Sequence, residues 1–237
     1  MTNRQSNIIF YSVISIIIYV IIVNNFYPEF FEDFSKSQNE LSIEKAMTQG
    51  EHNKALMLYQ KRVEEKISTG DAGSPETADT YEAMADLHRL LGNKVEEKNY
   101  YLKALEIRKL SKTAKISSIV NTYNKLGSIA QNEAQYDQAQ QYYEQSLAKM
   151  LGNTQKQKGE DEGVFEGMHN AQQRHVRLNN EWTIAVFKKL GEIHQVKKEY
   201  PIAKKYYEKA LAASKLTYGE DDVNTLEIIG IMERFDL

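Results

Sequence analysis

The sequence predicts an all-α protein: an α-solenoid of about four helix pairs with a C-terminal capping helix, preceded by one transmembrane helix. A pattern of small and aromatic residues returns at fixed distances along the chain, which is typical of arrays whose units bury their apolar faces against their neighbours. The chain has only three prolines and no alternating run typical of a half-buried strand. Residues 8–23 form an apolar run without a charge.

The repeat is clearest where a small residue is followed by an aliphatic one. Ser146, before Leu147, is matched 42 residues earlier by Ala104 and another 42 earlier by Arg62. The next match, Ala210, comes 64 residues later, which is the period plus an insertion of 22. A tyrosine precedes each site by three positions: Tyr59, Tyr101, Tyr143 and Tyr207. We expect the small residues where paired helices cross closely and the tyrosines in the gaps between pairs.

This pattern resembles the tetratricopeptide (TPR) family, which has an aromatic and Leu-Gly in the first helix of each pair. Leu126–Gly127 and Leu190–Gly191 carry that signature. A period of 42 exceeds the usual length of about 34 and is similar to the longer repeats of the kinesin-light-chain type. The resemblance covers about residues 39–237. Three positions depart from it: Asn39 replaces an aromatic residue, Arg62 an alanine, and Glu97 a small residue.

The predicted domains are an anchor at 1–24, an aromatic juxtamembrane segment at 25–37, and a TPR domain at 38–237. Ser74 and Pro75 form a helix start, as N-cap and first helical residue. The insertion, about 153–180, is either a loop or an extension of the flanking helices, and either a contact element or a tolerated surface insertion. The expected helices are 38–50 with 53–68, 76–91 with 94–111, 114–132 with 136–151, 181–196 with 200–216, and a capping helix at 221–235.

Residues 8–23 predict a lipid-embedded anchor, with the bilayer as one partner of the protein. At 1.5 Å per residue the run spans about 24 Å, which is short of the hydrocarbon core of about 30 Å, so its aromatic and asparagine flanks must lie close to both interfaces. The alternative is a cleaved signal peptide, but residues 23–27 offer no small-x-small cleavage site. An aromatic collar follows and indicates an interfacial belt or, alternatively, a cover for the first repeat. Its residues are Phe26, Tyr27, Phe30 and Phe31.

The charges flanking the anchor predict its orientation. Arg4 precedes the apolar run, whereas Glu29, Glu32 and Asp33 follow it. Because positive charges tend to stay inside, we expect a cytoplasmic N-terminus and a TPR domain that is periplasmic or in the equivalent organellar compartment.

Composition and motifs favour a non-enzymatic protein. A formal net charge of −3 gives no general attraction to nucleic acid, and the absence of cysteine removes thiol chemistry. His169 and His175 lack the spacing of a helical metal pair, and His88 and His194 fall at interior positions of first helices. We therefore expect no catalytic residue, no metal site and no cofactor.

The resemblance implies a concave groove, lined by the first helices, that binds other proteins. Mapped by period, the groove is acidic at its start and amide-rich in its centre, which favours a basic or extended polypeptide; the alternative is a solvated face. We expect a membrane-anchored scaffold acting in a membrane complex, or alternatively a receptor for client polypeptides. The mapped residues are Glu40, Glu44, Asp79, Glu82, Asp86, Arg89, Asn121, Asn124, Ser128, Gln131, Asn132, Lys188 and Glu192.

Overall fold

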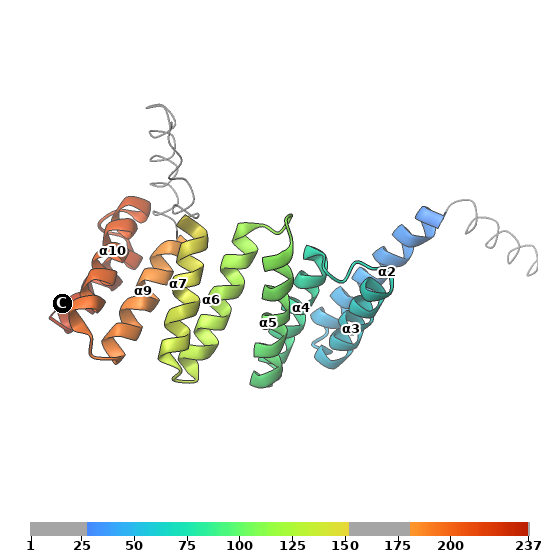
Figure 1. Cartoon of the computed structure of the whole chain (residues 1–237), viewed down its shortest axis with the longest axis horizontal. Coiled ribbons are helices and arrows are strands. Elements are labelled where there is room, and N and C mark those ends of the chain that lie inside the picture. Colours follow the sequence, from blue (N-terminus) through green and yellow to red (C-terminus); the bar gives the residue numbers. More distant parts are fainter. Residues whose placement is uncertain (1–27, 152–180, 237) are drawn as a thin grey trace, which may run out of the picture. The chain divides into compact units, whose positions relative to one another are not determined.

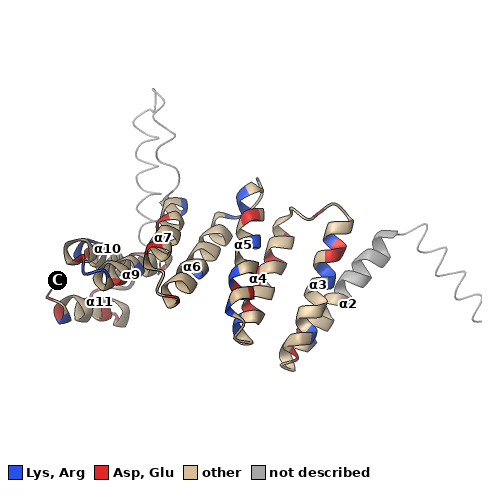
Figure 2. Ribbon diagram, turned by 60° about the horizontal axis from the view of Figure 1, so that its bottom comes forward, with Lys and Arg blue, Asp and Glu red and all other residues tan. Residues whose placement is uncertain are grey.

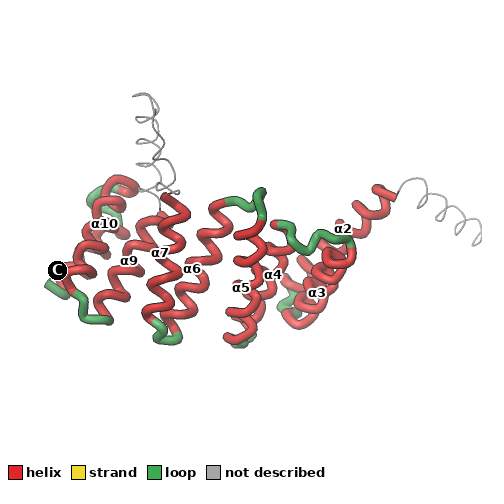
Figure 3. The backbone as a smooth tube through the Cα atoms, in the orientation of Figure 1, coloured by secondary structure: helices red, strands yellow, loops and turns green. Residues whose placement is uncertain are grey.

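A computed structural model describes the backbone of residues 28–151 and 181–236 and the side chains of residues 38–150 and 181–236. Across these residues the secondary structure is helical, and no strand occurs among them (Figure 3). The all-α prediction is therefore confirmed for the described part. The helices are α2 (Pro28–Thr48), α3 (His52–Ser68), α4 (Pro75–Leu90), α5 (Lys94–Leu110), α6 (Ile116–Asn132), α7 (Tyr136–Leu151), α9 (Glu181–Val196), α10 (Tyr200–Tyr218) and α11 (Val223–Arg234).

The chain divides into two compact units, residues 1–62 and 63–237. In the first unit α2 faces the beginning of α3, and Ile43, Ala46 and Ala55 are buried there. An ion pair joins Arg62 to Glu40, with Nη2 and Oε1 separated by 3.2 Å. Small residues of both helices are thus buried, which agrees with the small positions of the repeat.

The second unit is a row of helix pairs, α4 with α5, α6 with α7, and α9 with α10, closed by α11 (Figure 1). One buried cluster joins α4, α5 and α6, and includes Tyr101, Tyr123 and Leu126. A second joins α6, α7 and α9, and a third joins α9, α10 and α11. Each pair therefore shares its core with the next one, so that the apolar interior continues along the unit.

Glycine lies at the closest helix crossings. A Cβ atom on Gly127 would stand 2.8 Å from Cε1 of Tyr143, and one on Gly191 would stand 2.9 Å from Cε1 of Tyr207. Both tyrosines are almost fully buried. The small residues therefore lie at close crossings within a pair, as predicted, whereas Tyr143 and Tyr207 contact them inside the same pair and not only in the gaps between pairs.

The turn inside each pair uses a left-handed residue at the same repeat position. Gly50 and Gly92 have φ values of 70° and 77°, and Ala134 and Lys198 have values of 57° and 61°. This conformation ends the first helix and lets the chain reverse. Between pairs, Ser74 caps α4 as predicted, because its side chain accepts a hydrogen bond from the Thr77 amide.

The helix limits differ from the sequence prediction mainly at the N-terminal end. α2 begins at Pro28, about ten residues before the predicted start of the array. Proline lacks an amide hydrogen and suits the first turn of a helix, and no glycine or proline interrupts the residues after it. The helical backbone therefore includes Phe30 and Phe31, whose side chains lie outside the described residues.

Other predicted features also lie outside the described residues. These are the anchor at 8–23, Phe26 and Tyr27 of the collar, and the insertion at 153–180. Within residues 28–151 and 181–236, no helix is both long and apolar enough to cross a bilayer.

Candidate functional site

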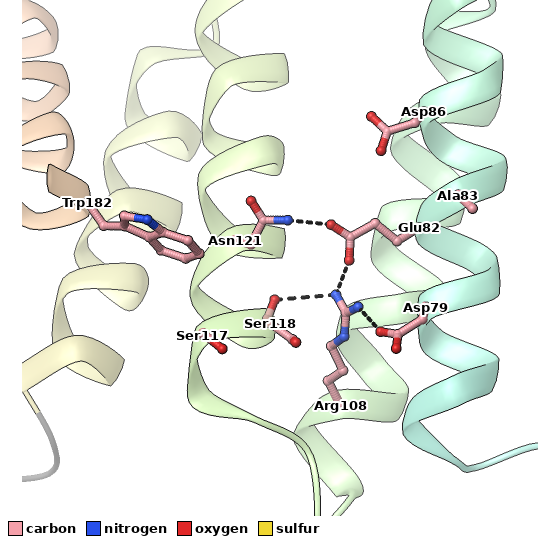
Figure 4. A pocket seen from close by; sticks show the side chains of 9 residues that line it. All are labelled: Asp79, Glu82, Ala83, Asp86, Arg108, Ser117, Ser118, Asn121 and Trp182. Carbon is pink, nitrogen blue, oxygen red and sulfur yellow. Dashed lines mark hydrogen bonds and ion pairs between the residues drawn. The ribbon is translucent and has the colours of Figure 1, made fainter.

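The second unit has a pocket of about 610 Å³ at its first helices, here called the central pocket. α4 supplies its acidic wall, α6 its floor, and the beginning of α9 its far side (Figure 4). The four lining residues of α4 share one face of the helix, because residues three or four positions apart lie on the same side of an α-helix. The central pocket is lined by Asp79, Glu82, Ala83, Asp86, Arg108, Ser117, Ser118, Asn121 and Trp182.

Arg108 organises the acidic wall although it belongs to α5, a second helix. Its side chain is only 3% exposed, and it forms ion pairs with Asp79 and Glu82. Nη1 also donates to the backbone oxygen of Ser118 at 3.3 Å and contacts the Thr122 hydroxyl. One guanidinium therefore ties α5 to both α4 and α6.

Glu82 is held from both sides and is not a free acid. Its side chain is 14% exposed; Oε2 pairs with Arg108, and Oε1 accepts a hydrogen bond from Nδ2 of Asn121 at 2.5 Å (Figure 4). The sequence predicts an acidic groove in this repeat, and the structure adds Arg108 from α5, which neutralises part of that charge. The sequence analysis did not include Arg108 among the groove residues, because its position in the repeat is a buried one. Met150 and Ser214, which are buried, occupy the equivalent position in the next two repeats.

Asp86 lies at one end of the acidic wall of the central pocket (Figure 4). Tyr101 donates its hydroxyl to Asp86 Oδ1 at 2.7 Å, and Lys125 and Arg89 lie 3.4 and 3.2 Å from the same oxygen. Burial favours a higher pKa for Asp86, but the hydrogen bond from Tyr101 and the nearby Lys125 and Arg89 outweigh it and hold the pKa below its ordinary value. Burial raises the pKa of Tyr101, so its hydroxyl stays protonated and keeps donating.

A second pocket, here called the basal pocket, lies beyond the Asp86–Lys125 pair and has a volume of about 430 Å³. It is formed by the end of α4, the start of α5 and the last turns of α6. Of the predicted groove residues, Arg89, Ser128 and Asn132 meet here. The basal pocket is lined by Arg89, Gly92, Lys94, Glu97, Lys125, Ser128, Ile129, Asn132 and Glu133.

The charges are unevenly divided between the helices that form the two pockets. α6 contributes one charged side chain, Lys125, whereas α4 carries four acids and one arginine (Figure 2). Three carboxylates and one guanidinium give the central pocket a formal charge of −2. A polar floor thus separates an acidic wall from the aromatic ring of Trp182.

The remaining predicted residues are spread over other contacts. Gln131 donates to Glu192 at 3.1 Å, which links α6 to α9, and Lys188 lies 2.7 Å from Glu227, which links α9 to α11. Asn124 has a buried Oδ1 with no hydrogen-bond partner among the described atoms. Glu40 and Glu44 belong to the first unit.

Trp182 is a further pocket residue that the sequence prediction missed. It is the only tryptophan of the chain, lies in the first turn of α9, and packs partly against the cluster shared by α6, α7 and α9. Its position directly after the insertion is the feature of the sequence that could have identified it as a candidate site residue.

No group of three or more histidine, cysteine or acidic residues that could hold a metal ion occurs among the described residues. His194 is buried, its ring stacks on Tyr206 at a centroid distance of 5.3 Å, and its Nδ1 lies 2.5 Å from Glu199. His88 stacks on Tyr100 in the same way. Both histidines are therefore packing residues, whereas His169 and His175 lie in the part that is not described.

Comparison with known proteins supports the repeat assignment. The family model of the tetratricopeptide repeat matches residues 78–109 and 120–148, which correspond to α4 with α5 and α6 with α7. Among curated proteins, no match was found. Residues 78–109 and 120–148 therefore match tetratricopeptide repeats, and the described helices continue the same paired arrangement on both sides of them.

Solved structures with similar helices have low sequence identity to this chain. BtubC (BKLC) from P. vanneervenii is 14% identical, with a TM-score of 0.54 over 84% of this chain and 67% of that one. The kinesin-light-chain-like repeats from Podosopora anserina are 17% identical, with a TM-score of 0.40 over 77% and 96%. MamA is 16% identical, with a TM-score of 0.38 over 77% and 94%. Of these three structures, BtubC has a TM-score above 0.5, and at 14% identity the likeness shows a similar fold and nothing about function.

Proposed function

We propose that this protein is a membrane-anchored TPR scaffold that holds another protein close to a bilayer, as an assembly factor or accessory subunit of a membrane complex. The observation that carries the proposal is the central pocket, whose charged groups are already fixed by Arg108, Asn121 and Tyr101. A pocket ordered before binding loses little side-chain entropy when a partner arrives.

The central pocket favours a basic or extended polypeptide as its partner. Its formal charge of −2 attracts cationic side chains, and Asp79 remains 64% exposed although it pairs with Arg108. Trp182 offers an aromatic face on which a lysine or arginine side chain can lie.

The membrane part of the proposal is supported by the sequence. The uncharged run at 8–23, the collar of Phe26, Tyr27, Phe30 and Phe31, and the single Arg4 ahead of the run favour an anchor with a cytoplasmic N-terminus. The TPR domain then lies on the extracytoplasmic side or in the equivalent organellar compartment.

Membrane fractionation tests the anchor. Alkaline carbonate should leave the full chain in the membrane pellet but release a chain that begins at Pro28. External protease should degrade the TPR domain in sealed right-side-out vesicles. Release of the full chain contradicts the anchor, whereas protection of the domain contradicts the orientation.

Co-purification from detergent-solubilised membranes tests the scaffold role. Ser117→Lys places a cation in the central pocket at an exposed position, so we expect the variant to fold. The matched control, Gln141→Lys, is exposed on α7 outside the pocket. A membrane protein that co-purifies with the wild type and the control, but not with Ser117→Lys, supports the proposal. A free monomer in every preparation contradicts it.

A second candidate function is a receptor that captures client polypeptides transiently, and the accessible pocket favours it. A receptor should bind short basic peptides with fast exchange and lose them in Ser117→Lys, whereas a scaffold should yield a stoichiometric complex. Reversing the charge of Glu82 is a poor test, because it would break the buried pair with Arg108.

A further inference from the structure

The outer face of α11 exposes apolar surface within the described part of the chain. Thr225 and Ile228 are completely buried, Ile228 in the cluster shared with α9 and α10, so the opposite side of the helix points away from the row. That side carries Leu226, which is 52% exposed, and Gly230. The last helix of a repeat array needs a polar outer face when that face meets water. The outer face of α11 departs from this rule.

Gly230 leaves the middle of this face open. A Cβ atom there would have no atom within 4 Å. Glycine weakens a helix interior relative to alanine, so a helical glycine indicates a place where another group approaches closely. Gly127 and Gly191 serve in this way for tyrosine rings of their own pairs, whereas no described residue approaches Gly230. The approaching group at Gly230 therefore has to come from elsewhere.

Opposite charges lie on either side of Gly230 along the helix. Glu227 precedes it by three residues and is 55% exposed, although its Oε2 pairs with Lys188. Arg234 follows it by four residues, is exposed, and forms no ion pair with a described residue. Glu227 and Arg234 are seven residues apart, so their side chains share one side of the helix. When two such helices lie antiparallel, Glu227 of each faces Arg234 of the other, about a twofold axis that passes between Gly230 and Ile231.

We propose that α11 pairs with α11 of a second copy of this chain, in antiparallel orientation, to form a twofold dimer. Such an interface is self-complementary, so every contact occurs twice. The open surface at Gly230 receives Ile231 of the second copy, and Leu226 is covered beside it. One helix of three turns per chain is a small interface compared with the roughly 1,200 Å² of stable complexes, so the dimer should be weak and should dissociate on dilution.

The dimer goes beyond the proposed function and does not depend on it. It needs neither the membrane anchor nor a partner polypeptide, so it can form when no other protein co-purifies. A dimer carries two central pockets, so it can hold one partner at two points and strengthen that attachment.

Cysteine crosslinking of the full chain in detergent tests the pairing, because the sequence has no cysteine of its own. Gly230→Cys places the two thiols beside the twofold axis and should give a disulfide-linked dimer on mild oxidation. Val223→Cys is the control on the same helix, at a position that is 74% exposed. In the antiparallel pair the two copies of residue 223 lie about 22 Å apart, too far for a disulfide. Failure to crosslink at 230, or equal crosslinking at both positions, overturns the inference.

Charge variants test the two residues that face each other. Arg234→Glu and Glu227→Lys each bring like charges together twice, so each variant alone should dimerise at least about tenfold more weakly in sedimentation of the full chain. Mixed in equal amounts, the two variants regain both contacts between opposite charges, and heterodimers should form with about the affinity of the wild type.

The matched controls are Lys109→Glu and Glu96→Lys, which make the same changes of charge at exposed positions of α5 and should dimerise as the wild type does. Glu227 and Arg234 are both exposed, so their variants should give the circular dichroism of the wild type. Undiminished dimerisation of either single variant, or no recovery on mixing, overturns the inference.

Discussion

The guanidinium of Arg108 lies between α4 and α6 but comes from neither helix. Its side chain is 3% exposed and pairs with Glu82, which is 14% exposed. Removing one member of a buried pair leaves the other charge without compensation, which is costly even where the pair itself adds little stability. We expect Arg108→Met, which introduces the residue found at position 150, to lower the free energy of unfolding by about 3 kcal/mol in urea titrations followed by circular dichroism.

The double variant Arg108→Met with Glu82→Gln is the control for that prediction. With both charges gone, most of the lost stability should return, since a neutral pair of similar volume has no uncompensated charge. A single variant as stable as the wild type would show that Glu82 is adequately solvated without Arg108.

Glu97 predicts a stability that depends on pH. Its pKa is raised in the folded state, so the fold disfavours the ionised form; this cost is absent below the unfolded pKa of about 4.3 and is complete above the folded pKa. Glu97→Gln should therefore raise the melting temperature at pH 7 and have little effect near pH 4. The groups facing Glu97 are Arg89 and Asp86 from α4, Lys94 from α5 and Lys125 from α6.

The neighbouring substitution Glu96→Gln provides the comparison for Glu97. Glu96 is exposed on the same helix, so its variant should melt as the wild type does at both pH values. An increase at pH 4 equal to that at pH 7 would mean that the gain comes from packing and not from ionisation.

The helices themselves were largely predictable because the repeat fixes where each crossing falls. The predicted ranges 136–151 and 181–196 coincide with α7 and α9. Within one helix the period also grouped Glu82 and Asp86 on one face, and both line the central pocket. It could not place Arg108, because a long side chain that reaches across two helices depends on the space left by its neighbours and not on the spacing along its own helix.

Alanine substitution should destabilise the fold at a glycine that lies in a close helix crossing and stabilise it at a helical glycine that faces open space. Gly127→Ala would force a Cβ atom to within 2.8 Å of the buried Tyr143 ring. Overpacking costs about 1–3 kcal/mol, whereas the better helix propensity of alanine returns about 1 kcal/mol. Ala85 faces Tyr101 in the preceding repeat, so the crossing can adapt, and we expect a net loss of about 1 kcal/mol in urea unfolding.

Gly230→Ala is the matched comparison on α11. A Cβ atom there would have no atom within 4 Å, so only the propensity gain remains, and the variant should be about 0.5–1 kcal/mol more stable than the wild type. If both variants gain stability equally, Tyr143 moves freely and the crossing is not tightly packed.

The second unit should respond to damage locally, because each helix pair packs against the next one along the row. Its three buried clusters are shared between consecutive pairs, and α11 contacts α10 at the C-terminal end. In such arrays stability is close to a sum of repeat and nearest-neighbour interactions. A defect at one end should therefore weaken adjacent helices and leave distant ones protected.

Hydrogen exchange of the Ile228→Ala variant tests this locality. Ile228 of α11 is fully buried in the cluster with Phe187 and Ala210, so the truncation should cost about 3 kcal/mol. Amide exchange should then accelerate in α11 and α10, less in α9, and not in α4 or α5. Val223→Ala, at a position 74% exposed on the same helix, should leave the whole pattern unchanged. Equal acceleration in every helix would instead mean that the second unit opens as one cooperative body, with coupling that extends past nearest neighbours.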